Sequence, residues 1–83
     1  MKVTREIAVY ENWGEKFIER FEINVSLKNL LQIINPDMAD DPELLRVYPL
    51  SKIQYDKLMD LEPKLKKIDF RKFEVFYECH RPS

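Results

Sequence analysis

Two alternating segments joined by a four-residue turn constrain the fold of this 83-residue chain more than any other feature. Apolar and polar residues alternate from Lys2 to Glu11 and again from Lys16 to Ile23, which is the period of a half-buried strand. The turn Asn12-Trp13-Gly14-Glu15 lies between them, and Gly14 can adopt the positive φ that a tight turn requires. Because so short a turn joins only antiparallel neighbours, the sequence predicts a β-hairpin.

A third strand is predicted from Lys67 to Glu78, where apolar residues again alternate with charged ones. Ile68 and Phe70 are out of phase with the rest, which predicts a bulge near Arg71-Lys72. We expect this strand to pair with an edge of the first strand. The buried face of the sheet then receives Val3, Ile7, Val9, Phe17, Phe21, Ile23, Phe73, Val75, Tyr77 and Cys79. The uncovered face carries an aromatic and charged mixture that a partner could contact: Tyr10, Ile18, Arg20 and Phe76.

Capping residues predict two helices after the hairpin. Ser26 can cap the first helix, which ends at Asn35-Pro36 and buries the stripe Leu27, Leu30, Leu31 and Ile34. Ser51 and Gln54 form a capping-box pattern for the second helix. This helix should run to Glu62, stop at Pro63 and bury Tyr55, Leu58 and either Met59 or Leu61, with Ile53 at the edge of the stripe.

An extra short helix is predicted between these two, because Asp41 can cap it and Pro42 suits its first position. Pro49 prevents it from continuing, and Tyr48 and Leu50 should anchor the resulting corner in the core. We therefore expect a single domain over residues 1–83 with an α+β fold. It should contain a three-stranded antiparallel sheet in ββααβ order, with the extra short helix, and helices packed on one face.

The composition argues against a reactive or metal site. Cys79 is the only cysteine and His80 the only histidine, so neither an internal disulfide nor a zinc cluster can be built. Neighbours on a strand point to opposite faces, so we expect Cys79 in the core and His80 at the surface rather than a nucleophile and its base. The aspartates near residue 40 lack the spacing and the glycine of a calcium loop. We expect no enzyme, cofactor, metal or small-molecule substrate.

Localisation follows from the apolar segments. Charges interrupt the run MKVTREIAVYE, so we do not expect a signal peptide, and no window of the sequence has the length of a membrane span. With one cysteine, the sequence predicts a reduced, cytoplasmic protein without a membrane partner.

The charged residues are unevenly distributed, although the net charge is −1. Residues 36–62 hold seven acids against three bases, whereas residues 63–83 hold six bases against three acids. An acidic flank can steer a cationic partner toward itself. The candidate partner-binding residues are Asp37, Asp40, Asp41, Glu43, Asp56, Asp60, Glu62 and Trp13. Trp13 at the hairpin tip can equally fold back onto the core, and the basic last third is the alternative interface.

Several short motifs suggest a family. They are Asp41-Pro42-x-Leu44, Val47-Tyr48-Pro49-Leu50-Ser51, Gln54 with Leu58, and Phe76-Tyr77-Glu78-Cys79. Together they resemble a small bacterial domain found among immunity proteins of contact-dependent growth inhibition and related toxin systems. The resemblance implies a cytoplasmic protein that binds the C-terminal domain of its cognate toxin, often a nuclease, and blocks it. An electropositive nuclease groove would meet the acidic residues above.

Two other functions stay open. The first is a structural or regulatory module that self-associates through a strand edge or the uncovered sheet face. The second is an RNA-binding module, which the basic cluster Lys64, Lys66, Lys67, Arg71 and Lys72 favours. We do not expect nucleic acid as the partner, because Phe76 lies on the face opposite to Phe73 and Tyr77, and stacked bases need aromatic residues on one face.

Overall fold

The hairpin predicted from the alternation forms the centre and one edge of a larger sheet. The computed structural model describes residues 3–13 and 16–81, so Lys2 and the predicted turn glycine, Gly14, lie outside the described residues. β1 (Thr4–Glu11) pairs antiparallel with β2 (Phe17–Ile23) on one side and with β4 (Phe73–His80) on the other. The predicted pairing of the last strand with the first is therefore confirmed.

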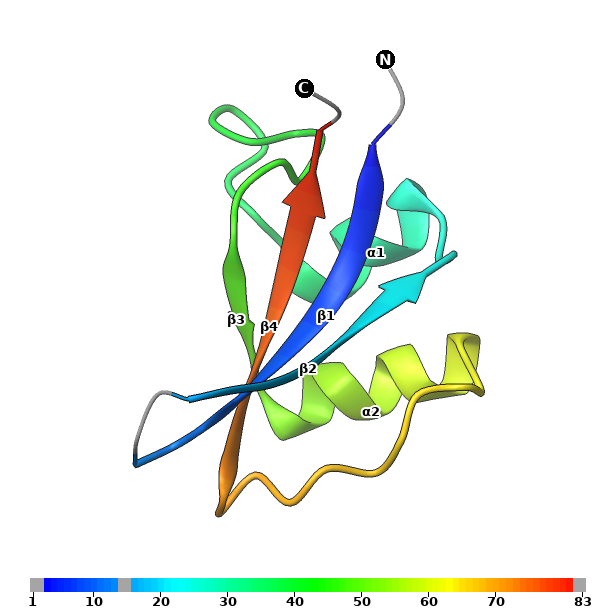
Figure 1. Cartoon of the computed structure of the whole chain (residues 1–83). Coiled ribbons are helices and arrows are strands. Elements are labelled where there is room, and N and C mark those ends of the chain that lie inside the picture. Colours follow the sequence, from blue (N-terminus) through cyan, green and yellow to red (C-terminus); the bar gives the residue numbers. More distant parts are fainter. Residues whose placement is uncertain (1–2, 14–15, 82–83) are drawn as a thin grey trace.

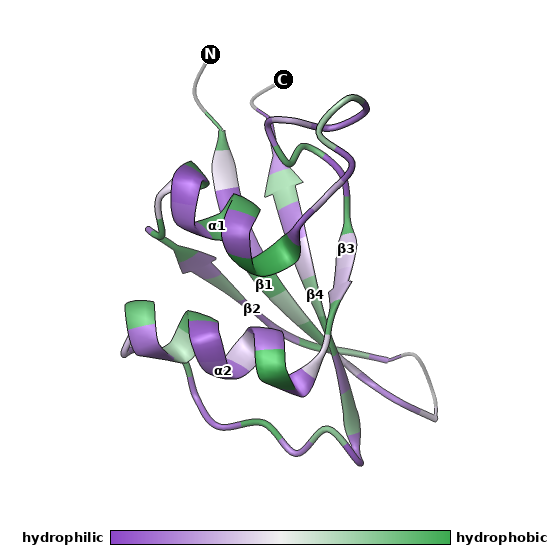
Figure 2. Cartoon of the chain, turned by 180° about the vertical axis from the view of Figure 1, so that it is seen from behind, coloured by the Kyte–Doolittle hydropathy of each residue, from purple (hydrophilic) through white to green (hydrophobic). Residues whose placement is uncertain are grey.

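The sheet has four strands in the described residues, in the order β2-β1-β4-β3, so the prediction of three strands is wrong. The additional strand, β3 (Tyr48–Leu50), pairs antiparallel with β4 at the edge. α1 (Leu27–Ile34) and α2 (Lys52–Leu61) both lie behind the sheet, as Figures 1 and 2 show from opposite sides. The α+β class is thus confirmed, whereas the ββααβ order is not, because β3 interrupts it.

Both helices begin at the capping residues that the sequence predicts. The Ser26 hydroxyl accepts a hydrogen bond from the backbone N–H of Asn29, and Ser51 and Gln54 form the reciprocal capping box. α1 ends where Asn35 adopts a left-handed conformation with φ 54°. In α2, Tyr55 and Leu58 are buried and Met59 packs against the core, whereas Ile53 and Leu61 are exposed.

The predicted short helix after Asp41 does not form. The Asp41 carboxylate accepts from the backbone N–H groups of Leu45 (2.9 Å) and Arg46 (3.1 Å). A helix N-cap would serve the amides two or three residues on, so these contacts close a wider loop instead. Leu44 also adopts φ 52°, which interrupts any right-handed turn. The chain therefore enters β3 at Tyr48, and we call residues 35–47 the Asp41 loop.

The register of the β1–β2 pair differs from the sequence prediction. A bulge where the β1–β2 register shifts between Val9 and Tyr10 places Phe17 opposite Tyr10. Phe17 thus lies on the uncovered face, and Ile18 instead lines a hollow with Val9 and Phe21 of the covered face, because one extra residue reverses which face a side chain occupies.

The last strand also starts later than predicted. It begins at Phe73, because Asp69 accepts the backbone N–H groups of Lys72 and Phe73 on its carbonyl in a tight turn. Ile68 and Phe70 are out of phase with β4 because they precede this turn, not because the strand bulges near Arg71-Lys72.

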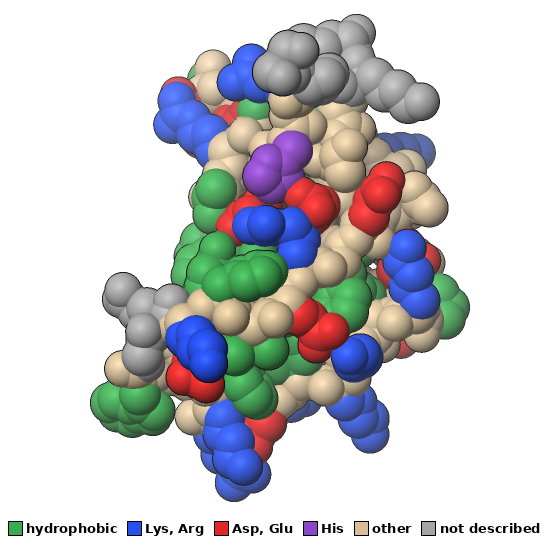
Figure 3. Space-filling view, in the orientation of Figure 1, with side chains coloured by type: hydrophobic (Ala, Val, Ile, Leu, Met, Phe, Trp, Pro, Cys, Tyr) green, Lys and Arg blue, Asp and Glu red, His purple; other side chains and the backbone are tan. Residues whose placement is uncertain are grey.

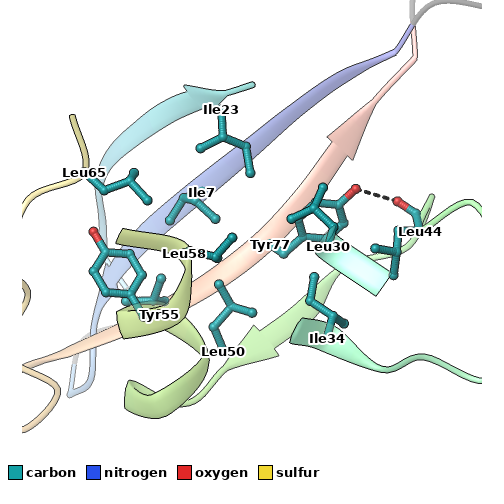
Figure 4. Packing of buried hydrophobic residues seen from close by; sticks show 11 residues of the cluster. Ile7, Ile23, Leu30, Ile34, Leu44, Leu50, Tyr55, Leu58, Leu65 and Tyr77 are labelled. Atoms are coloured by element: carbon teal, nitrogen blue, oxygen red, sulfur yellow. Dashed lines mark hydrogen bonds between the residues drawn. The ribbon is translucent and has the colours of Figure 1, made fainter. Parts of the chain in front are cut away.

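The core lies between the covered face of the sheet and the two helices (Figure 4). Ile7, Val75 and Tyr77 of the sheet meet Leu30 of α1 and Leu58 of α2. Leu44 of the Asp41 loop is fully buried beside them, and its carbonyl accepts a hydrogen bond of 2.7 Å from the Tyr77 hydroxyl. This bond and the buried Leu44 side chain tie the irregular loop to the sheet.

Candidate functional site: the uncovered face of the sheet

The face of the sheet that points away from the helices, here called the open face, is built from side chains in rows across the strands. Opposed residues of antiparallel strands share a face, so the registers define each row. The first row, the glutamate row, holds Glu22, Glu6 and Glu78. The second row holds Arg20, Ala8, Phe76 and Pro49. The third row holds Phe17, Tyr10 and Glu74.

Like charges directly opposed on neighbouring strands destabilise a sheet, so the glutamate row needs compensation. Arg20 supplies it, because its guanidinium lies 2.9 Å from the Glu78 carboxylate and 3.8 Å from that of Glu6. Burial acts to lower the Arg20 pKa, but the hydrogen bond to Glu78 and the charges of both glutamates together outweigh it and raise the pKa. His80 adds a contact of 2.8 Å from its Nε2 to Glu6.

Aromatic side chains fill the other half of the open face. The Tyr10 ring meets Phe17 and Phe76 edge to face, with centroids 5.6 and 5.7 Å away, and we call these three residues the aromatic trio. The Arg20 guanidinium lies 5.0 Å from the centroid of the Phe17 ring, which links the trio to the glutamate row. Figure 3 shows hydrophobic side chains beside a cluster of acidic, basic and histidine side chains on this side of the molecule.

A shallow hollow of about 310 Å³ opens beside the trio, lined by Tyr10, Val47, Glu74, Phe76 and Glu78. Val47 is 58% exposed at its rim. The hollow combines apolar walls with two carboxylates, which suits a cationic side chain whose stem is apolar, as in lysine or arginine.

The net charge of the open face is negative. Four carboxylates, those of Glu6, Glu22, Glu74 and Glu78, stand in its rows against the single guanidinium of Arg20. An anionic surface of this kind attracts cationic groups and repels phosphates.

Asp41, one of the predicted partner-binding acids, is instead an internal structural residue. Its side chain is buried, and its carboxylate accepts from Leu45, Arg46 and the Tyr48 hydroxyl, the last at 2.6 Å. Burial acts to raise the Asp41 pKa, but these hydrogen bonds outweigh it and hold the pKa below its usual value. The bond to Asp41, with burial, raises the pKa of Tyr48 to about 12. The assignment of Asp41 to a contact surface is therefore corrected.

The other predicted acids do not gather on one surface. Asp37, Asp40 and Glu43 belong to the Asp41 loop, whereas Asp56, Asp60 and Glu62 lie on or next to α2, toward the other end of the sheet (Figure 1). Several are engaged locally, since Asp40 pairs with Arg46 (2.7 Å) and Asp56 with Lys52 (2.9 Å). The sequence block is thus two separate groups in space.

Trp13, the remaining predicted contact residue, is exposed. Its side chain is 93% exposed at the hairpin tip, which decides between the two alternatives that the sequence left open. Trp13 follows Tyr10 in the chain and lies past the third row of the open face, away from the second row.

Sequence reasoning missed the glutamate row. The alternation already placed Glu6 and Glu78 on the uncovered side, together with Tyr10, Arg20 and Phe76. It could not show that they are directly opposed, because that depends on the β1–β4 register. Phe17 could not be assigned to the open face from the sequence, because the bulge changes the side on which it lies. Val47 could not be assigned to the hollow, because the sequence did not predict the Asp41 loop.

The fold and this face define a class: an α+β domain with two helices on one side of an antiparallel sheet and an anionic, aromatic surface on the other. Residues 4–78 match the family model of a domain of unknown function, DUF7683, and the chain belongs to this family. No curated protein and no solved structure matches the chain. In the described part of the chain, neither helix is long and apolar enough to cross a membrane.

Proposed function

We propose that the protein acts by binding, as an immunity protein that neutralises a cognate bacterial toxin domain, and that the open face makes the contact. The observation that carries this choice of surface is the aromatic trio beside the glutamate row, on the face opposite to both helices of the described residues. Protein interfaces favour aromatic anchors at their centre within a polar, solvent-accessible rim.

The expected partner is cationic. A nuclease domain of the toxin would present lysine and arginine side chains in its phosphate-binding groove, and the hollow by Glu74 and Glu78 suits such groups. The negative charge of the open face would speed association at low salt. The proposed interface therefore lies on the sheet instead of in residues 36–62, where the sequence predicts it, and it is again acidic.

The test uses the C-terminal domain of the toxin encoded next to the gene for this chain as the probe. Co-expression should restore growth to cells that make this domain, and the purified pair should bind with a salt-dependent association rate. Phe76→Ala should weaken binding about tenfold or more, as truncation of an interface anchor does. Ile53→Ala is the matched control, because Ile53 is 69% exposed on α2.

Charge reversal distinguishes the two candidate surfaces. Glu74→Lys on the open face should weaken binding, whereas Glu43→Lys in the Asp41 loop and Asp60→Lys on α2 should not. The reverse pattern would restore the interface predicted from the sequence. A neighbouring gene region without a toxin, or a toxin domain that this chain neither binds nor neutralises, would overturn the immunity proposal itself.

A further inference from the structure

The two edges of the sheet differ in their ability to pair with another strand. β3 forms one edge with only three residues, and Pro49 within it has no backbone N–H to donate. β2 forms the other edge with seven residues and contains no proline (Figure 1). An edge strand of this length presents a row of unpaired backbone groups, which is a template for another strand.

We propose that β2 pairs antiparallel with β2 of a second copy of this chain, centred on Phe21, so that two sheets join into one. In this register Phe21 lies opposite Phe21 of the other copy. Arg20 lies opposite Glu22 of the other copy, and the same pair recurs by symmetry on the other side of the centre. Both pairs lie on the open face, where Arg20 and Glu22 already stand.

The charge pattern selects this register over its neighbours. Opposed residues of antiparallel strands share a face, and side chains on one face of a strand are two residues apart. A symmetric pairing that joins the two open faces must therefore be centred on a residue, and the candidates near the middle of β2 are Arg20, Phe21 and Glu22. A centre at Arg20 opposes two arginines and a centre at Glu22 opposes two glutamates, which destabilises each arrangement. Only the Phe21 centre opposes opposite charges, and it uses residues 19–23, which avoids the bulge at Ile18.

The second copy would also complete the glutamate row. Glu22 is exposed at the outer end of this row, and the ion pairs of the described residues do not include it. Arg20 of the second copy would stand beside it. On the covered face, the Lys66 ammonium lies 5.4 Å from the Phe21 ring centroid and pairs with Glu19. In the dimer it would lie beside the two opposed Phe21 rings. The open face would be extended, not covered, so the inference is independent of the proposed function.

Sedimentation equilibrium over a concentration series tests the dimer. The chain should shift from monomer to dimer as its concentration rises. Glu22→Arg places an arginine opposite Arg20 of the other copy at both symmetry-related positions, so it should lower the association constant at least about fivefold. Asp60→Arg makes the same charge change on α2 and should leave association unchanged. A monomer at every concentration up to the solubility limit, or equal effects of the two variants, would overturn the proposal.

Cysteine crosslinking tests the register in a Cys79→Ala background. Phe21→Cys should form a disulfide between copies on mild oxidation, because opposed Cα atoms lie about 4.5–5.5 Å apart. Arg20→Cys alone should not, since its two copies are offset by about 7 Å along the strands as well as across them. A mixture of Arg20→Cys and Glu22→Cys chains should crosslink with each other. If Arg20→Cys crosslinks with itself as readily as Phe21→Cys, or if neither Phe21→Cys nor the mixture crosslinks, the register is wrong.

Discussion

The covered and open faces of the same sheet use polar side chains in opposite ways. On the covered side, Arg5 and Tyr77 bind backbone carbonyls of the Asp41 loop, with Arg5 Nη1 3.0 Å from the Glu43 carbonyl and 2.5 Å from the Tyr77 hydroxyl. On the open side, Arg20 pairs instead with the carboxylates of Glu6 and Glu78. Polar groups on the first side hold the fold together, and those on the second remain within reach of a partner.

The difference follows from what each group can satisfy. Every buried side-chain nitrogen and oxygen atom in the described residues has a hydrogen-bond partner, because an unsatisfied polar group inside a protein costs free energy. Surface pairs exchange partners with water at little cost, so they contribute less to stability and are available for binding. We therefore expect mutations to separate the faces, with large stability effects on the covered side and binding effects on the open side.

The largest effect is expected for Leu58→Ala, at the centre of the covered side. Leu58 is fully buried, so its truncation should lower the free energy of unfolding by about 2–5 kcal/mol through lost burial and a cavity. Urea denaturation followed by circular dichroism measures it. The control Ile53→Ala, on the exposed side of the same helix, should change the free energy by no more than about 0.5 kcal/mol. Similar values for both variants would contradict the assignment of the α2 faces.

Asp41→Ala should produce the next largest effect. It leaves the Tyr48 hydroxyl and two backbone N–H groups without their acceptor, which should cost about 1–3 kcal/mol of unfolding free energy. Asp40→Ala, which breaks a surface pair with Arg46, should cost about 0.2–1 kcal/mol. Guanidinium denaturation of both variants makes the comparison, and an Asp41 variant as stable as the Asp40 variant would show that the loop does not depend on this carboxylate.

The Asp41 carboxylate should also make the stability of the protein sensitive to acid. Its pKa is lower in the folded than in the unfolded protein, so its contribution is complete above about pH 4 and is lost as the pH falls below that. The unfolding free energy of the native protein should therefore decline at acid pH. Asp41→Asn, which has no carboxylate to titrate there, should show a shallower decline across the same pH series. Parallel curves would mean that Asp41 is not responsible.

Alkaline pH should weaken the covered side by a comparable route. Burial raises the pKa of Tyr77 to about 12, although the Arg5 contact opposes it, and burial raises that of Tyr55 to about 12 as well. Unfolded tyrosine ionises near pH 10, so stability should be complete below that value and fall as the pH rises toward 12. Thermal unfolding of Tyr77→Phe should show a smaller loss over this range, and Tyr10→Phe on the open face serves as the comparison. A Tyr77→Phe curve identical to the native one would mean that Tyr77 does not contribute to the loss of stability at alkaline pH.

The smallest stability effect is expected on the open face. Arg20→Gln breaks partly exposed pairs with Glu6 and Glu78 and should cost about 0.2–1 kcal/mol of unfolding free energy. Because the Glu–Arg contacts are screened by ions, the cost should shrink in high salt, whereas that of Leu58→Ala should not. Chemical denaturation at two ionic strengths checks both statements. A salt-independent cost for Arg20→Gln would indicate that its packing against Phe17 matters more than its charge.

Local patterns in the sequence determined the hairpin, the two helix starts and the α+β class. Alternation and caps depend on residues a few positions apart, so Ser26, Ser51 and Gln54 could be interpreted without knowing the rest of the fold. The open face could be predicted in outline for the same reason, since alternation already placed Tyr10, Arg20 and Phe76 on one side.

Only the tertiary structure decided the role of Asp41, the fourth strand and the glutamate row. Asp41 has the sequence signature of a helix cap, but the buried Leu44 and the Tyr77 hydroxyl draw the loop onto the sheet and leave Asp41 to satisfy the amides that result. β3 and the opposition of Glu6 to Glu78 depend on pairing with β4, whose residues lie far away in the chain. Such contacts carry no local pattern, because burial and register arise only when distant segments meet.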